Sequence, residues 1–574
     1  MEYVVHLINL VLVYSILGIS MNLLLGYTGL ISMTHAGFFA IGAYASALMT
    51  MHLGVNFLVG MIAGVAIVSI VGILIAIPAL RVRDEYLMLF TLAVQMVIFS
   101  TLTTNVEDLG GTTGIIGIPA AAIFGLRFSG PVSYLPLIFV FFGLCLAAMW
   151  RLTSSPFGRV LKAIRDDETA VRSLGKNILR FKVSVFVVAG AVAAVAGSVF
   201  GHYSISICPS TFSIHESIFI IAIVVIGGLA NIWGSVVAAF LLVVVPEALT
   251  FLPGGSAEIG AIRMAVYGLL LIVFMRFRSQ GILPEKVAFG RRGNMHMSLS
   301  SEEKNEILKS LGTSLHSRGS GSNTPPLEVC GVSKNFEGII AADNISLTLP
   351  EGKITALIGP NGAGKTTLFN LITGFEKVDG GRVLLRGREI TKFPPHVVSK
   401  LGIGRSFQEV RVFPGMSVLD NILVSFANQR GERLFPLFFQ PWRVFGQEER
   451  NCRRAMAYLD FVGLAEKSQE AAGDLSFAEQ KLLVFACLLA TEADVLLIDE
   501  VVSGVDPKAI GGILDLIGQL SASGKTILII EHNLDVVKGI ADWTYFLAQG
   551  HVVATGTPSE LMSDAKLAEI YFGA

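Results

Sequence analysis

Nine consecutive residues in the second half of the chain have the types and spacing that phosphate binding requires. They read GPNGAGKTT, follow the strand-like ITALI and precede the helical LFNLITG. The glycines let successive backbone N–H groups point at phosphate oxygens without obstruction by Cβ atoms, at a helix N-terminus whose dipole favours anions. A glycine-rich turn that matches by chance is the alternative, and the strand–loop–helix order disfavours it. The predicted nucleotide site comprises Gly359, Pro360, Asn361, Gly362, Ala363, Gly364, Lys365, Thr366 and Thr367.

Two side chains of this loop are expected to have separate roles. Lys365 should reach the β- and γ-phosphates of the nucleotide, and the Thr366 hydroxyl should ligate Mg²⁺. We therefore expect ATP and Mg²⁺ to bind together in this half of the chain.

A second chemical signal is VLLIDE, residues 495–500, in which four apolar residues precede two carboxylates. A parallel strand buried on both faces is continuously apolar, and ligands bind at the carboxyl ends of such strands. We expect Asp499 to hold Mg²⁺ through water and Glu500 to polarise the attacking water. An isolated acidic pair at a strand end is common, but the phosphate-binding loop upstream favours the catalytic interpretation.

The order of the motifs from Leu327 to Ala574 resembles the ATP-binding cassette family. The matching stretches are SKNFEGI, GRSFQEV, LSFAEQK, SGVDP and LIIEHN, besides the two described above. The resemblance implies roles for Phe336 (stacking on adenine), Gln408 (catalysis and Mg²⁺), Ser476 (signature), Asp506 (D-loop) and His532 (catalytic switch). Taken singly, a Gln or a His is usually solvated or satisfied, and Phe336 could be a core residue. Their shared order favours the functional interpretation.

The resemblance also implies that Ser476 acts on an ATP bound by a partner cassette, because two cassettes of this family face head to tail. The signature departs from the family pattern, since Phe477 and Ala478 replace the usual paired glycines. Val501 stands where a proline normally follows the two acids. The Ala478 methyl group is expected to crowd the closest approach to the γ-phosphate and to weaken one ATP site.

The first half of the chain has the composition of a membrane protein. No Asp, Glu, Lys or Arg occurs from Tyr3 to Leu80, and the chain as a whole is 53% hydrophobic and 15% charged. A membrane-crossing helix needs about 20 mostly apolar residues, and the apolar runs predict roughly nine spans. The runs are Tyr3–Gly26, Phe38–Met51, Phe57–Leu80, Tyr86–Val106, Phe128–Trp150, Val183–Gly201, Ser217–Pro246 (two spans, broken near Gly227-Gly228) and Ala261–Met275. The first run is expected to be retained as a span rather than cleaved.

Charged residues predict the orientation of this half and exclude some partners. The loops rich in Lys and Arg, at residues 81–83, 151–182 and 276–278, should all lie in the cytoplasm, which places the second half there too. The net charge of −1 gives no reason to expect nucleic acid as a partner. The five cysteines are scattered, without a CxxC pair, so neither a disulfide framework nor a zinc site is expected.

The first half resembles the permeases of branched-chain amino acid importers. The resemblance rests on Met21–Leu48, Pro78–Ala93, Gly110–Ile115 and Val225–Ala239. Ser155–Gly175 resembles the cytoplasmic segment that such permeases dock onto the ATPase, and a solvated helix beside the membrane is the alternative. Polar residues within the apolar runs should pair between helices or line a polar pathway; these are Asn22, His35, Gln95, Asn231 and Glu247.

The expected fold is an α-helical polytopic membrane domain followed by an α/β P-loop cassette with a helical subdomain. We place the permease at residues 1–282, a flexible cytoplasmic linker at 283–326 and the cassette at 327–574. The expected function is ATP-driven import of branched-chain or other small amino acids across the bacterial inner membrane. The expected partners are the lipid bilayer, a periplasmic solute-binding protein, and a second permease and cassette that are either different subunits or a second copy. The alternatives are import of urea or short amides, an exporter half-transporter and an ATP-gated membrane sensor.

Overall fold

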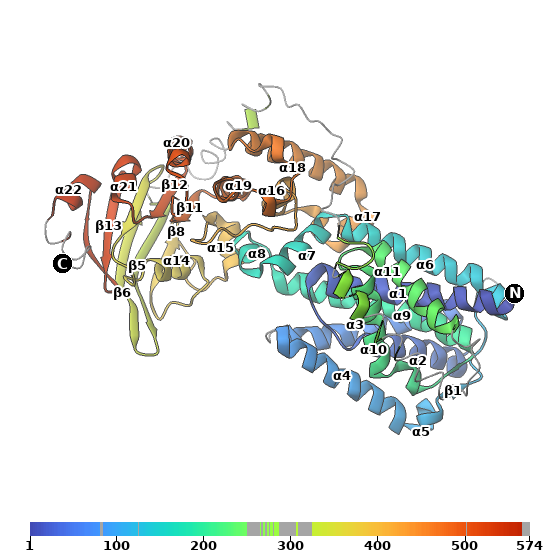
Figure 1. Ribbon diagram of the computed structural model, residues 1–574. Coiled ribbons are helices and arrows are strands. Elements are labelled where there is room, and N and C mark those ends of the chain that lie inside the picture. Colours follow the sequence, from blue (N-terminus) through green and yellow to red (C-terminus); the bar gives the residue numbers. More distant parts are fainter. Residues whose placement is uncertain are drawn as a thin grey trace. The chain divides into compact units, whose positions relative to one another are not determined.

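A computed structural model of the chain describes residues 1–80, 84–123, 125–248, 324–500 and 502–564, with short pieces and single positions elsewhere. It divides into two compact units (Figure 1). The first contains residues 1–165 and 178–286, and the second contains residues 166–177 and 287–574. A short piece of the N-terminal half, residues 166–177, therefore belongs to the same unit as the predicted cassette.

The first unit is helical, and six of its described helices are long and apolar enough to cross a membrane. They are α1 (Glu2–Thr28), α2 (His35–Leu53), α3 (Phe57–Ala79), α4 (Asp84–Thr104), α6 (Pro131–Thr153) and α9 (Ile178–Ser204). Shorter elements are α5 (Val106–Leu109), α7 (Pro156–Asp166), α10 (Ile214–Gly227), α11 (Ile232–Ala248), η1 (Gly111–Thr113), η2 (Pro209–Phe212), β1 (Ile115–Ile116), β2 (Ala122–Ile123), β3 (Leu126–Arg127) and β4 (Ser206–Ile207). Helix α8 (Glu168–Ser173) falls in the second unit.

The helices test the predicted spans one by one. Six of the runs correspond to the six long helices, and the predicted break near Gly227 is confirmed by the end of α10. Helices α10 and α11 are both shorter than the usual length for a span. The last predicted run, Ala261–Met275, lies largely outside the described residues, so the total of nine stays a prediction.

Small residues let α2 and α9 pack backbone against backbone. A Cβ atom added to Gly197 of α9 would lie 2.1 Å from the carbonyl oxygen of Phe39 in α2. A Cβ atom on Gly42 of α2 would lie 2.4 Å from the carbonyl oxygen of Ala194 in α9. The hydrophobic effect does not drive helices together in lipid, so van der Waals contact at this short distance stabilises their association instead.

Polar residues in the apolar runs form hydrogen bonds between helices. Asn22 donates to the carbonyl oxygen of Asn231 at 2.9 Å and to Ser235 Oγ at 2.7 Å, and accepts from the backbone N–H of Ala230 at 2.9 Å. His35 Nε2 lies 2.7 Å from Ser20 Oγ, which joins α2 to α1. Gln95 donates to the carbonyl oxygen of Phe212 at 2.9 Å, and Asn231 donates to that of Pro284 at 3.1 Å. The predicted pairing between helices is confirmed for Asn22 and His35, whereas Gln95 bonds to the 3₁₀ turn η2 and Asn231 to Pro284, which lies in no helix. The side chain of Glu247 lies outside the described ones.

Two sheets form the second unit (Figure 1). The central sheet has six strands in the order β10-β11-β12-β7-β13-β14, parallel except for β14. A four-stranded antiparallel sheet has the order β6-β5-β8-β9. The strands are β5 (Leu327–Phe336), β6 (Ile339–Leu349), β7 (Ile354–Ile358), β8 (Gly380–Leu385), β9 (Arg388–Glu389), β10 (Ile403–Arg405), β11 (Val495–Asp499), β12 (Thr526–Ile530), β13 (Trp543–Ala548) and β14 (His551–Gly556). Strands β7, β11 and β12 are buried at every position, as their continuous apolar sequences predict.

Helices of this unit cover the central sheet and build a helical subdomain. They are α14 (Lys365–Thr373), α15 (Pro395–Leu401), α16 (Val418–Ser425), α17 (Leu434–Phe439), α18 (Pro441–Phe461), α19 (Phe477–Ala490), α20 (Pro507–Ala522), α21 (Leu534–Ile540) and α22 (Pro558–Ser563). Single 3₁₀ turns lie at η4 (Arg430–Glu432), η5 (Ala465–Lys467) and η6 (Ala472–Asp474). Side chains of α16, α18 and α19 share one hydrophobic cluster with β7, β11 and β12, so the subdomain and the sheet have a common core. The predicted α/β fold with a helical subdomain is confirmed.

Candidate nucleotide site

The predicted phosphate-binding loop connects the buried strand β7 to the N-terminus of α14. Gly364, the N-cap residue, has φ +99°, and a Cβ atom there would lie 2.2 Å from the carbonyl oxygen of Ala341. Gly359 has φ +151°, and its added Cβ atom would lie 1.9 Å from the carbonyl oxygen of Leu547. Only glycine fits at both positions, because the neighbouring strands leave no space and the backbone has a positive φ. The loop therefore wraps the start of the helix with its N–H groups available to an anion.

Replacing Gly364 by alanine should weaken nucleotide binding. Its methyl group must displace the loop or strand β6, at a cost of about 1–3 kcal/mol, which corresponds to a loss of affinity on the order of tenfold or more. Titration calorimetry of the full chain with ATP measures this change. Gly518→Ala is the control, because this glycine of α20 has open space around its Cβ position. Equal affinity of the two variants would contradict the assignment of the loop.

The Lys365 ammonium group lies over its own loop. It donates to the carbonyl oxygens of Gly359 at 2.8 Å and Pro360 at 2.9 Å. Burial lowers the pKa of Lys365, whereas the nearby carboxylates of Glu500 and Asp499 act to raise it. These charges place the loop lysine and the two acids of β11 in one electrostatic site.

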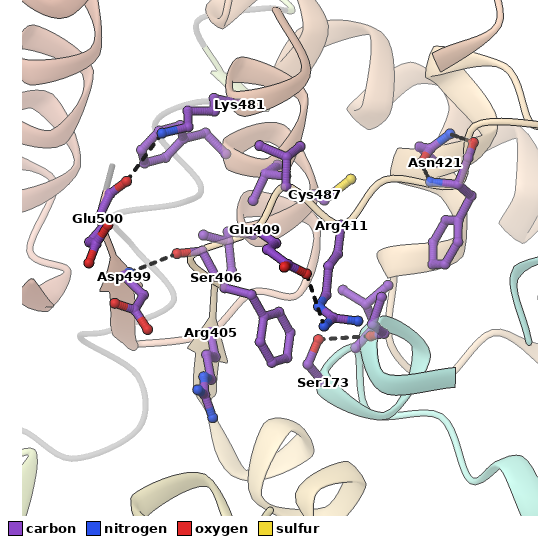
Figure 2. A pocket seen from close by; sticks show the side chains of 18 residues that line it. Ser173, Arg405, Ser406, Glu409, Arg411, Asn421, Lys481, Cys487, Asp499 and Glu500 are labelled. Atoms are coloured by element: carbon purple, nitrogen blue, oxygen red, sulfur yellow. Dashed lines mark hydrogen bonds and ion pairs between the residues drawn. The ribbon is translucent and has the colours of Figure 1, made fainter. Parts of the chain in front are cut away.

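Asp499 ends the buried strand β11 with its carboxylate directed into the site. The side chain is buried, and neither oxygen accepts a hydrogen bond from any residue that the structure describes. Burial raises the pKa of Asp499 to about 6, while the guanidinium of Arg405 acts in the opposite direction. Ser406 Oγ accepts the backbone N–H of Asp499 at 3.1 Å and so fixes the strand end against the loop after β10 (Figure 2). Two unsatisfied, buried carboxylate oxygens are the donor set that a hard cation requires.

Glu500 faces His532 across two neighbouring strands. Asp499 is in register with Ile530 of β12, so the residues that follow each strand meet at one edge of the sheet. Glu500 Oε1 lies 3.2 Å from His532 Nε2, and the Glu500 N–H donates to the carbonyl oxygen of Ile530 at 2.9 Å. The backbone of Glu500 has φ +47°, a conformation that costs a non-glycine residue about 1–3 kcal/mol. This local strain directs the carboxylate toward the histidine.

Lys481 of α19 stabilises the turn after Glu500. Its Nζ atom donates to the carbonyl oxygen of Glu500 at 3.1 Å (Figure 2). It also donates to the carbonyl oxygen of Ser503 at 2.6 Å. The sequence predicted no role for this residue, nor for Arg405 and Ser406. Lys481 lies in the same sequence stretch as Ser476, LSFAEQK, and this proximity was the signal that could have identified it. The lysine connects α19 to the turn that follows β11.

The other predicted site residues lie on exposed positions of the same unit. Phe336 is 39% exposed at the end of β5, with Lys334 Nζ 5.2 Å from its ring centroid, which fits a stacking surface rather than a core residue. Gln408 is exposed in the bend after β10, and Asp506 is exposed just before α20. Ser476 is the exposed N-cap of α19, and no contact within the described residues joins it to the phosphate-binding loop.

The unusual signature residues have local structural roles. Glu479 and Ser476 form a capping box, and Glu479 also pairs with Lys467 at 2.7 Å. The exposed ring of Phe477 packs beside Gly504, whose added Cβ atom would lie 3.2 Å from the ring. Ala478 packs against the core of the unit. The predicted weakening of one ATP site by Ala478 stays a prediction.

A cavity of about 60 Å³ extends from the two acids toward α8 (Figure 2). It is lined by Asp499 and Glu500, by residues 405–407 and 409–411, by α19, and by Ala170, Ser173 and Leu174 of α8 or just after it. This volume holds a few water molecules and not a nucleotide. The loop that contains Gln408 therefore borders both the acids and the segment 166–177.

Ion pairs attach that segment to the cassette. Asp167, the N-cap of α8, lies 2.6 Å from Arg411 Nη1. Lys176 is buried, pairs with Glu432 and donates to the carbonyl oxygen of Phe426 at 2.7 Å. Asn177 Nδ2 lies 3.2 Å from His396 Nε2. The segment is therefore anchored at both ends.

Comparison with known proteins shows the family. The description "Branched-chain amino acid transport system / permease component" matches residues 3–275, and "ABC transporter" matches residues 342–503. Over 250 residues the chain is 37% identical to the high-affinity branched-chain amino acid transport ATP-binding protein LivG of Salmonella typhimurium, covering 43% of this chain and 98% of that protein. The chain belongs to the branched-chain amino acid ABC transporter family.

Further relatives match the cassette of this ABC transporter subunit to a similar extent. The LivG protein of Escherichia coli K12 is 36% identical over 250 residues, covering 43% of this chain and 98% of that protein. A probable LivG of Archaeoglobus fulgidus is 36% identical over 248 residues, covering 43% of this chain and 95% of that protein. The chain is thus a membrane protein in which a permease is fused to a cytoplasmic, ATP-binding and ATP-hydrolysing cassette that powers transport.

Proposed function

We propose that the chain imports branched-chain amino acids across the bacterial inner membrane, driven by ATP hydrolysis in its own cassette. The proposal is carried by two features that occur in one chain. The first half matches the permease family, and the cassette brings Lys365, Asp499, Glu500 and His532 to one edge of its sheet. The ATP-binding relatives named above match only the cassette of this chain, over 95–98% of their own length. Fusion keeps the cassette at high effective concentration beside its permease.

The proposed ATP site is built by the phosphate-binding loop, with Lys365 on the β- and γ-phosphates and Phe336 stacked on the adenine. Glu500 orients and activates the attacking water, and His532 holds the Glu500 carboxylate and the transferred phosphoryl group in position. Ser476 and Asp506 act on the nucleotide of the facing cassette. The exposed positions of Phe336, Ser476 and Asp506 support contacts with ligand or partner.

Mg²⁺ fits this site because Asp499 has two buried oxygens without hydrogen-bond donors among the described residues. Thr366, exposed at the start of α14, and Gln408 would complete the protein ligands together with Asp499. When bound, the ion would neutralise charge on the phosphates. The few protein ligands are typical of Mg²⁺, which retains waters and binds largely through substrate phosphates.

The anchored segment 166–177 is the proposed mechanical link. It is continuous with α7 on one side and with the membrane helix α9 on the other, and it borders the Gln408 loop. Movement of that loop on ATP binding would displace the segment and so change the access of the permease. The working unit also requires a second permease and cassette, and a periplasmic solute-binding protein for capture. We assign residues 1–282 to the permease, 283–326 to a linker and 327–574 to the cassette.

Uptake by proteoliposomes tests the proposal. The complex, reconstituted with ATP inside and the solute-binding protein outside, should accumulate radiolabelled leucine, isoleucine or valine against a gradient. Omission of either ATP or the binding protein should abolish accumulation. Uptake of urea or short amides instead would change the substrate class, and ATP hydrolysis without any accumulation would indicate a sensor.

A further inference from the structure

Five large aromatic side chains lie exposed within eleven residues of the helical subdomain. Their exposed fractions are 65% for Phe435, 37% for Phe438, 66% for Phe439, 67% for Trp442 and 58% for Phe445. We call these five residues the aromatic patch. The ring centroids of Phe435 and Phe439 are 5.0 Å apart. The i, i+3, i+4 spacing of the patch residues in α17 and the i, i+3 spacing in α18 place each set on one face of its helix. Contiguous apolar surface of this kind on a folded protein marks an interaction site.

The aromatic patch is formed by two helices that bury their opposite sides. Leu437 of α17 and Val444 of α18 lie between the exposed aromatic residues in the sequence, and both are buried. Further along α18, Cys452 and Ala455 belong to the core cluster of the unit. The position of the patch is therefore fixed by packing. The exposed rings of Phe435, Phe438, Phe439 and Trp442 can therefore meet a partner without unfolding of the subdomain.

Exposed cations surround the aromatic patch. Arg430, Arg433 and Arg443 are all exposed, and Glu432 is the sole acidic residue between positions 430 and 445. Glu432 pairs with Lys176, so the patch has a net positive border. Aromatic rings beside arginines are characteristic of surfaces that lie in the headgroup region of a bilayer with anionic lipids.

Chain connectivity links the patch to a membrane helix. Lys176 pairs with Glu432 and donates to the carbonyl oxygen of Phe426, on the N-terminal side of α17. Helix α9, which is long and apolar enough to cross a membrane, begins at Ile178, two residues after Lys176. Glu432, which precedes the patch, is thus paired with a residue that lies two positions before the start of a membrane-crossing helix in the sequence.

We propose that the aromatic patch inserts into the headgroup region of the cytoplasmic leaflet, so that the bilayer itself is the partner of this part of the cassette. The patch then acts as a second attachment of the cassette to the membrane, besides segment 166–177. The inference rests on the proposed cytoplasmic orientation of the cassette and adds a lipid contact to it. The arginine border favours lipid phosphates over an apolar protein surface as the partner.

Fluorescence quenching in proteoliposomes tests this contact directly. The full chain retains Trp442 as its only tryptophan when Trp150, Trp233 and Trp543 are replaced by Phe. Phospholipids brominated near the headgroup end of the acyl chain should reduce the Trp442 emission. The matched variant that retains only Trp543, which is 36% exposed on β13, should show no such loss. ATPase activity of both variants verifies that the cassettes are folded.

Two outcomes overturn the proposed lipid contact. Quenching of Trp442 by aqueous iodide and not by brominated lipid would show a solvated surface. Protection from both quenchers would show that protein covers the patch. Lipid quenching of Trp442 without binding-protein-dependent uptake would support the membrane contact and reject the proposed transport function. Failure of the lipid contact can therefore be distinguished from failure of the proposed transport.

The arginine border gives an independent measurement. In vesicles with anionic lipid, Arg433→Gln combined with Arg443→Gln should reduce the lipid quenching of Trp442. Arg382→Gln combined with Arg388→Gln, at exposed arginines of the antiparallel sheet, should leave it unchanged. Equal quenching in both double variants would show that the cations do not contribute to the contact and would overturn the headgroup assignment.

Discussion

Replacing Glu500 by glutamine should reduce ATP turnover by about 10²–10⁴-fold and leave ATP binding intact. The amide retains the size of the carboxylate, and the backbone of residue 500 stays held by Ile530 and Lys481. It loses the ability to accept a proton from the attacking water. Because the Glu500 carboxylate lies 3.2 Å from His532 Nε2, the change removes one of the groups that meet at the sheet edge. Phosphate release at saturating ATP and equilibrium binding of ATP are the two measurements.

Glu389→Gln is the matched control for this variant. Glu389 is an exposed residue of the short strand β9 in the antiparallel sheet, so the same chemical change there should leave turnover unchanged. Leucine uptake should fall in parallel with turnover in Glu500→Gln. Full turnover in that variant would show that another group activates the water.

The sequence predicted the two acids at the end of β11 from the apolar run that precedes them and from the phosphate-binding loop upstream. A run of apolar residues that ends in carboxylates predicts a buried strand with its acids at the ligand edge, and all five residues of β11 are buried. The position of His532 did not follow in this way. LIIEHN contains no sign that β12 is the neighbour of β11, since strand order in a parallel sheet is set by packing along the whole chain. Only the family resemblance predicted a role for this histidine.

Residues that act through tertiary contacts were missing from the sequence interpretation. Lys481 reaches the carbonyl oxygens of Glu500 and Ser503 from a different helix. Arg405 donates to Asn370 at 2.7 Å and lies 4.8 Å from the ring of Phe407. A single lysine or arginine in a sequence has many possible partners, and solvation is the commonest outcome. No spacing rule selects the correct one.

The ends of the membrane helices show a second limit of prediction from the sequence. Charge-free runs predicted a span from Val183, whereas α9 begins at Ile178 and includes Arg180 and Lys182. Arg180 is exposed, and a cation at the end of a membrane helix can direct its charged group toward the interface while its stem covers apolar surface. The helix therefore extends past the apolar run, and hydropathy alone shortens it.

The ion pair between Lys176 and Glu432 should be required for transport much more than for ATP hydrolysis. Both side chains are largely buried, with 2% and 12% of their surface exposed. Breaking a buried pair by removing one partner costs about 3–5 kcal/mol, because a charge is left without compensation. If this energy anchors segment 166–177, Lys176→Met should reduce the anchored population by roughly 10²–10⁴-fold. ATP hydrolysis should continue while the amount of leucine imported per ATP falls steeply.

Two further variants separate anchoring from a general loss of stability. Lys353→Met removes one partner of an ion pair whose side chains are 55% and 40% exposed, and such pairs contribute only about 0–1 kcal/mol, so coupling should persist. Lys176→Met combined with Glu432→Leu places apolar groups on both sides, and replacement of both partners is often neutral. This double variant should therefore recover coupling relative to Lys176→Met. Normal leucine import per ATP in the Lys176→Met variant would mean that the segment transmits no motion from the cassette through this anchor.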